Sequence, residues 1–149
     1  MPPLNEHPFR IRPGQRVDLG AFPTTDETLF PVEKKEGKEL FDRLEDRIDE
    51  LQERLYAEGK RRLLVVLQAM DTGGKDGTIR NIFDKMDPQG VRVAFFKRPS
   101  EIELAHDYLW RVHPHVPGDG QVGIFNRSHY EDIVAVRVRE IFPEAVWSR

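Results

Sequence analysis

The feature that most constrains the fold of this chain is a continuous apolar run at residues 63–67 that leads into a glycine-rich stretch. Leu-Leu-Val-Val-Leu has the length of a β-strand, and its lack of polar positions predicts a strand buried on both faces of a parallel sheet. The stretch from Ala69 to Thr78 contains three glycines, and a helical pattern of apolar residues follows it. The predicted order is therefore strand, glycine-rich loop and helix.

The alternation of strand and helix continues after this unit. Residues 91–96 and 122–125 predict two more strands. Ser100, with Glu103 three residues later, is a capping box that opens a helix expected to run through Leu109, and a last helix is predicted from Tyr130 through Ile141. Strands that alternate with helices indicate βαβ units, and hence an α/β fold whose parallel sheet lies between two layers of helices.

The region before the first strand has two parts. Six prolines within residues 1–32 prevent a long helix, so we expect an extended arm over residues 1–35. The arm is either a strap that packs on the body or on a neighbouring subunit of a homo-oligomer, or a partly ordered tail. Between Glu36 and Gly59, apolar residues recur at spacings of three and four, which predicts an amphipathic helix. Residues 36–149 are expected to form one incomplete domain, because three strands are fewer than such sheets usually have.

The composition excludes several classes of protein. The 149 residues include no cysteine, which rules out disulfides, thiolate zinc sites and cysteine nucleophiles. A formal net charge of -3 provides no global positive field for nucleic acid, so any anion site must be local. No apolar run approaches the roughly 20 residues of a membrane span, and the N-terminus does not have the pattern of a secretory signal. We therefore expect a cytoplasmic protein with no membrane or nucleic-acid partner.

The stretch from Ala69 to Thr78 is typical of a phosphate-binding loop of the P-loop (Walker A) kind. Its glycines allow successive backbone N–H groups to point inward, the following helix presents its positive end, and Lys75 supplies a mobile ammonium. Two positions depart from the usual pattern, because Ala69 replaces a glycine and Asp76 replaces a serine or threonine. The alternative interpretation is a glycine-rich turn that binds no ligand.

Two carboxylates, Asp71 and Asp76, lie within this anion-binding stretch. Carboxylates beside phosphates are favourable only when divalent cations lie between them, so we infer that the site takes Mg²⁺. For Asp76 an alternative stays open, because an acidic residue also stabilises the N-terminus of a helix.

Basic residues follow the other two predicted strands. Lys97 and Arg98 come after the second strand, and Arg127 comes after the third. Since ligands bind at the carboxyl edge of parallel sheets, these residues and Lys75 are expected to surround one crevice. Each of them, taken singly, is also compatible with an exposed basic residue that has no partner.

Three blocks of sequence, in this order, resemble the polyphosphate kinase 2 family. They are residues 68–79, residues 95–100 and residues 123–132, and the resemblance extends from about Glu36 to the end of the chain. It implies a fold like that of thymidylate kinase, that is, a P-loop kinase. It also implies a magnesium-dependent enzyme that moves phosphoryl groups between inorganic polyphosphate and nucleotides such as AMP, ADP and ATP.

The resemblance also implies roles for individual residues. Asp71 matches a magnesium-binding, catalytically required carboxylate, and Lys75 matches the lysine that holds the transferring phosphate. Asn126 and Arg127 match a second phosphate-binding motif, in which many relatives have Asp-Arg, and an amide is a weaker metal ligand than a carboxylate. Asn126 together with Glu131 resembles a subgroup that phosphorylates both nucleoside mono- and diphosphates. The remaining predicted phosphate contacts are Gly73, Gly74, Asp76, Gly77, Thr78, Lys97 and Arg98.

Three alternatives stay open at this point. Glu131 either orients the acceptor nucleotide or, as an acid early in a helix, stabilises the helix N-terminus. The chain is either a polyphosphate-dependent enzyme or a nucleotide kinase that uses ATP as its donor. It is also compatible with a fragment that binds polyphosphate or nucleotide without catalysis, because family members continue beyond residue 149 with further strands and a basic lid.

Overall fold

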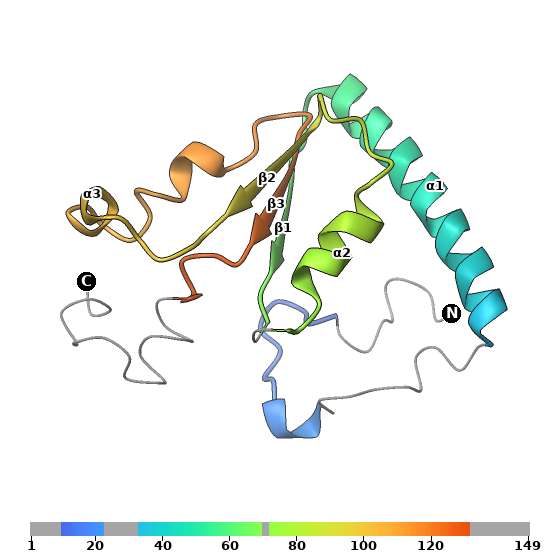
Figure 1. Cartoon of the computed structure of the whole chain (residues 1–149), viewed down its shortest axis with the longest axis horizontal. Coiled ribbons are helices and arrows are strands. Elements are labelled where there is room, and N and C mark those ends of the chain that lie inside the picture. The colour runs from blue at the N-terminus through green and yellow to red at the C-terminus, as the bar shows by residue number, and fades with distance from the viewer. Residues whose placement is uncertain (1–9, 23–32, 70–71, 132–149) are drawn as a thin grey trace. The chain divides into compact units, whose positions relative to one another are not determined.

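The computed structural model describes residues 10–22, 33–69 and 72–131 of the chain (Figure 1). The chain divides into two compact units, Met1–Phe41 and Asp42–Arg149. In the first unit, Asp18 caps a short 3₁₀ helix, η2 (Leu19–Ala21), by accepting a hydrogen bond from the N–H of Gly20 at 3.0 Å. The rest of the predicted arm lies largely outside the described residues.

The predicted amphipathic helix is present as α1 (Lys34–Glu58). In the second unit its later turns contact the segment that precedes the second strand. The buried side chain of Gln52 accepts a hydrogen bond from the N–H of Asp87 at 3.3 Å, and the Lys85 ammonium lies 2.9 Å from Asp46. The later part of α1 is thus attached to the segment before β2 through a buried amide and an ion pair.

The three predicted strands are confirmed as β1 (Leu63–Leu67), β2 (Val91–Phe95) and β3 (Val122–Asn126). Over the described residues they form a parallel sheet in the order β1-β3-β2. The register sets Leu67, Asn126 and Phe95 side by side at the carboxyl edge. The residues that directly follow the three strands therefore lie at the same edge of the sheet.

The burial predicted for the first strand is wrong. Leu63 is 49% exposed, and Leu64 and Val66 are each 42% exposed. By contrast, β3 is buried at every position. The reason is topological: β3 has a strand on each side, whereas β1 pairs with β3 alone among the described residues.

Two layers of chain cover the two faces of the sheet. On one face Phe96, Phe125, Ala94 and Val112 form a buried cluster. Because side chains alternate along a strand, Asn126 points to the opposite face from Phe125, and there it contacts α2 (Lys75–Ile82). Figure 1 shows α2 beside β1, with all three strand arrows pointing the same way. The predicted α/β class is confirmed.

The helix predicted from Ser100 through Leu109 is much shorter than expected. The capping box of Ser100 and Glu103 is present, but α3 (Glu101–Leu104) ends after one turn. The carboxylate of Asp107 accepts a hydrogen bond from the N–H of Leu109 at 2.9 Å, and this local turn competes with continuation of the helix. The helix predicted from Tyr130 to Ile141 lies, apart from its first two residues, outside the described residues.

Within the described ranges, no helix is both long and apolar enough to cross a membrane.

Candidate functional site

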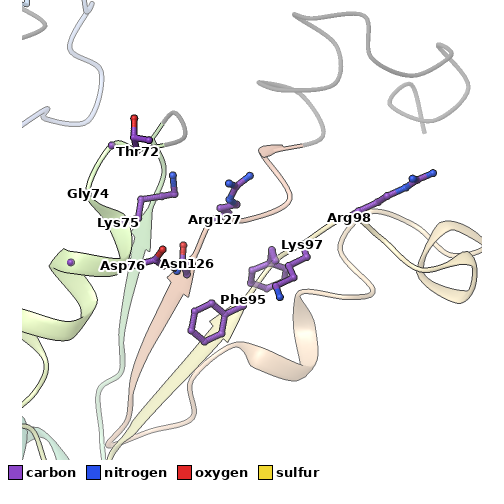
Figure 2. Close-up of a pocket in the computed structure, with 12 residues that line it drawn as sticks. Thr72, Gly74, Lys75, Asp76, Phe95, Lys97, Arg98, Asn126 and Arg127 are labelled. Atoms are coloured by element: carbon purple, nitrogen blue, oxygen red, sulfur yellow. Dashed lines mark hydrogen bonds between the residues drawn. The ribbon is translucent and has the colours of Figure 1, made fainter.

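Residues from three separate segments line one cavity of about 620 Å³ at the carboxyl edge of the sheet (Figure 2). The segments are the glycine-rich loop with the start of α2, the residues after β2, and the end of β3. Four basic residues and one acidic residue line this space, so its lining carries a net positive charge although the chain as a whole is acidic. The lining residues are Thr72, Gly73, Gly74, Lys75, Asp76, Gly77, Phe95, Phe96, Lys97, Arg98, Asn126 and Arg127.

The backbone of the glycine-rich loop is left-handed at two described positions, one of which is a glycine. Gly74 lies in the left-handed region with φ of 80°, and Thr72 is also left-handed with φ of 66°. Gly74 is the N-cap of α2, so the N-terminal turn of the helix, with its positive dipole end, lies at the cavity. Thr78, predicted to contact phosphate, is not among the lining residues, and its hydroxyl donates to the carbonyl of Gly74 at 3.1 Å.

The loop lysine is held by its own loop. Lys75 is half-buried, and its ammonium donates a 2.8 Å hydrogen bond to the carbonyl oxygen of Ala69. Lys75 and Arg127 both extend beyond the strand ends in Figure 2. An ammonium held beside the N-terminal end of a helix is an arrangement suited to an anionic phosphate.

Asp76 and Asn126 form a direct link between α2 and β3. The side-chain amide of Asn126, which is buried, donates a 2.6 Å hydrogen bond to the Asp76 carboxylate. Asp76 occupies the second position of α2, and its carboxylate lies among the cations that line the cavity. Asn126 therefore fixes the N-terminal turn of α2 against the sheet edge.

The basic residues after β2 and β3 reach the cavity in different ways. Arg127 has a left-handed φ of 64°, and its guanidinium pairs with Glu131 at 2.7 Å. Lys97 lines the cavity directly, whereas Arg98 is exposed and extends away from the glycine loop in Figure 2. Glu131 is not among the lining residues and contacts the cavity through Arg127.

Two residues of this region were missed by sequence reasoning. Arg111, whose side chain is 8% exposed, donates a 2.7 Å hydrogen bond to the backbone carbonyl of Lys97. These residues are 14 positions apart and lie in irregular segments, so no periodicity indicated their contact. Phe95 is 61% exposed at the cavity, and its signals were its place near the end of a predicted strand and in the second block of family resemblance.

Arg111 also contacts the capping box that follows Lys97 and Arg98. Its Nε atom lies 3.5 Å from the carboxylate of Glu103. The backbone N–H of Ser100 donates to that carboxylate and lowers the pKa of Glu103 below its ordinary value, and the nearby charge of Arg111 adds to the effect. The loop that carries Lys97 and Arg98 is thus held by the contacts of the Glu103 carboxylate with Arg111 and Ser100.

Oxygen donors suited to Mg²⁺ are present in the cavity. The carboxylate of Asp76 lies there with the amide of Asn126, and hard oxygen ligands of this kind are those that Mg²⁺ prefers. Asp71, the predicted metal ligand, lies outside the described residues. The described part of the chain holds no cluster of three or more histidine or acidic side chains arranged around a metal position.

Comparison with known proteins identifies the relatives of this chain. Residues 31–149 match the family model described as polyphosphate kinase 2. An AMP/ADP-polyphosphate phosphotransferase of Meiothermus ruber is 52% identical over 141 residues, which are 95% of this chain and 53% of the relative. An ADP-polyphosphate phosphotransferase of Rhodopseudomonas palustris is 43% identical over 130 residues, which are 87% of this chain and 45% of the relative.

Solved structures show the same likeness. The crystal structure of polyphosphate kinase 2 from Arthrobacter aurescens TC1 superposes with a TM-score of 0.80 at 40% identity, over 94% of this chain and 50% of that one. The predicted P-loop kinase-like fold is confirmed by this likeness. The chain spans about half the length of the curated relatives named above. On the family match and these identities, the chain belongs to the polyphosphate kinase 2 family.

Proposed function

We propose that this chain carries the site of a phosphotransferase that moves a phosphoryl group between inorganic polyphosphate and nucleoside mono- and diphosphates. The observation that carries the proposal is the convergence of Lys75, Lys97 and Arg127 with the open end of α2 around one cavity. Relatives whose names describe polyphosphate transfer to AMP and ADP support the same substrates. Inorganic polyphosphate is a chain of anions, and a local group of cations fits it better than the acidic surface elsewhere.

A nucleotide also fits the composition of this cavity. Beside the cations, the ring of Phe95 presents an apolar face that is 61% exposed. A ligand that is phosphorylated at one end and aromatic at the other can use both features, because aromatic rings stack on aromatic side chains. Neither feature alone distinguishes a nucleotide from a simple polyanion.

The transfer itself needs positioning and charge stabilisation rather than a covalent enzyme intermediate. An oxygen of the acceptor phosphate forms a bond to the terminal phosphorus of the donor, and the bond from that phosphorus to the bridging oxygen of the donor breaks. Lys75 and the loop N–H groups stabilise charge on the transferred group, while Lys97 and Arg127 hold donor and acceptor in line. The donor leaves one phosphate shorter, and the acceptor gains one.

Magnesium fits the site through its carboxylates. We propose that Asp71 holds the ion, as the family resemblance implies, and that Asp76, in the first turn of α2, contributes a carboxylate at the cavity. When bound, Mg²⁺ would supply positive charge that offsets the charge of the phosphates. Asn126, an amide where many relatives have an acid, binds Asp76 instead of adding a second charged ligand at the end of β3.

A paired donor assay tests the proposal. Purified protein is given AMP with either polyphosphate or ATP as the donor, or ADP with polyphosphate, and products are separated by chromatography. Product formation from polyphosphate is expected, and the Asp71→Asn variant is expected to lose most of the turnover while staying folded. Transfer from ATP alone would identify a nucleotide kinase instead. Binding of polyphosphate without any transfer would identify a binding module.

A further inference from the structure

The side chain of Gln68, which the proposed mechanism does not use, connects the ends of two strands. Gln68 is the first residue after β1 and is half-buried. Its amide donates a hydrogen bond to the carboxylate of Glu131, and its carbonyl oxygen accepts one from the hydroxyl of Ser128 at 3.4 Å. Both polar atoms of this one carboxamide are thus bound to residues that follow β3.

The carboxylate that Gln68 holds is the partner of Arg127. The second oxygen of Glu131 accepts a 2.7 Å hydrogen bond from the Arg127 guanidinium. The backbone N–H of Arg127 donates to the carbonyl of Leu67 at 3.0 Å, so the arginine is held at its backbone as well. Its left-handed φ of 64° costs on the order of 1 kcal/mol for a residue with a side chain. The surrounding contacts stabilise that conformation.

The residues on either side of Gln68 complete the arrangement. The carbonyl of Leu67 binds the backbone of Arg127, and the carbonyl of Ala69 binds the ammonium of Lys75. Three consecutive positions at the end of β1 therefore hold two cations that line the cavity. Of these three positions, Gln68 is the one that acts through its side chain. A substitution there can therefore remove its contacts without changing the backbone.

We propose that Gln68 is a positioning residue, which orients the Arg127 guanidinium toward phosphate by holding the Glu131 carboxylate in place. The proposal rests on the proposed function, because it assigns Arg127 a phosphate to bind. Glutamine suits this position because the amide donates to a carboxylate while the carbonyl oxygen accepts from a hydroxyl. A glutamate here would place two carboxylates against each other and disturb the partner of Arg127.

The test compares Gln68→Glu and Gln68→Met with the wild-type protein and with Gln89→Glu. Gln89 lies exposed in the turn before β2, away from the cavity, and its variant makes the same chemical change without touching the network. Steady-state kinetics are measured with varied polyphosphate at several pH values, and binding of tripolyphosphate is measured by calorimetry. Thermal unfolding reports whether each variant is folded.

The expected result is a rise of about tenfold in the KM for polyphosphate in Gln68→Glu, the size expected for a misplaced charge-assisted contact. A merely structural role would reduce the amount of active protein and therefore kcat, with KM unchanged. As the pH falls, the introduced carboxyl is protonated and no longer repels the Glu131 carboxylate, so the defect of Gln68→Glu should shrink. Gln68→Met loses both contacts without adding charge, so its KM should rise without this pH dependence, and Gln89→Glu should match the wild type.

The two proposals fail in different ways. Wild-type protein that neither binds tripolyphosphate nor transfers phosphate would overturn the proposed function. Wild-type protein that does both, with unchanged KM in Gln68→Glu and Gln68→Met, would overturn the role of Gln68 alone. If Gln68→Glu does not fold, the KM of Gln68→Met decides the question. If neither variant folds, Gln68 is a structural residue and the positioning role is rejected.

Discussion

The buried guanidinium of Arg111 holds the backbone carbonyl of Lys97 at 2.7 Å, although the two residues belong to different loops. The same side chain lies 3.5 Å from the Glu103 carboxylate and over the ring of Phe96, 5.3 Å from its centroid. A buried cation needs such partners, because an unpaired charge in this position is strongly unfavourable. The same contacts of Arg111 therefore stabilise the domain and hold the backbone of Lys97 at the cavity.

Replacing Arg111 should destabilise the protein. In Arg111→Met, the Lys97 carbonyl loses a charged donor and the Glu103 carboxylate loses an ion-pair partner, and we expect a loss of about 2–3 kcal/mol in the free energy of unfolding. Urea denaturation measures it. The control is Arg47→Met, since Arg47 pairs with Glu50 on the exposed side of α1 and should contribute at most about 1 kcal/mol. Equal losses in the two variants would show that the buried contacts of Arg111 add nothing.

The stability of the protein should fall in acid partly through Glu103. Its pKa is lowered in the folded state, chiefly by the hydrogen bond from the N–H of Ser100. The stabilisation is therefore present above the ordinary glutamate pKa of about 4.3 and is lost as the pH falls through the lowered pKa. At neutral pH Glu103→Gln should be less stable than the wild type, and the difference should shrink in acid.

Denaturation of the wild type and of Glu103→Gln from about pH 7 down to about pH 3 checks this expectation. Glu101→Gln is the control, because Glu101 is an exposed acid in the same turn of α3. The difference in the free energy of unfolding between the wild type and Glu101→Gln should stay small at every pH. A difference between the wild type and Glu103→Gln that is the same at every pH would contradict the assigned cause.

The sequence predicted that the cations would meet at one edge of the sheet. It did not predict the contacts that hold them there. Parallel strands end at one edge, so the positions of Lys75, Lys97 and Arg127 after three strands were enough to place them together. The exposure of β1 depends on which strand occupies the centre of the sheet, and apolar pattern does not encode that order. The contact of Arg111 with Lys97 depends on the path of an irregular loop, which no local pattern specifies.

Two glycines that line the cavity should respond in opposite directions to an added methyl group. Gly74 has φ of 80°, so Gly74→Ala introduces strain although nothing lies within 4 Å of the added carbon. A loss of about 1 kcal/mol in the free energy of unfolding is expected. Gly77 lies within α2, also with open space around it, and Gly77→Ala should add about 0.5–1 kcal/mol.

The same pair of variants reports how closely a phosphate approaches the loop. Gly77 lines the cavity, so a phosphate bound against its backbone would meet the added methyl group of Gly77→Ala. We expect Gly77→Ala to be more stable than the wild type and to bind tripolyphosphate more weakly, measured by thermal unfolding and by calorimetry. Tighter or unchanged binding would show that the phosphate lies elsewhere along the loop.

The final prediction concerns the link between Asn126 and Asp76. Asn126→Asp removes the amide that donates to Asp76 and places two carboxylates where a 2.6 Å hydrogen bond now lies. Without divalent cations this should lower the free energy of unfolding by about 1–3 kcal/mol. Mg²⁺ should restore much of the loss, because a cation between two carboxylates relieves their repulsion and binds the folded state.

Asp76→Asn keeps an acceptor oxygen without the charge, so it should remain near wild-type stability and gain little from Mg²⁺. Thermal unfolding in EDTA and in Mg²⁺ separates these outcomes, and an equal effect of Mg²⁺ on both variants would show that the two side chains do not form a cation site.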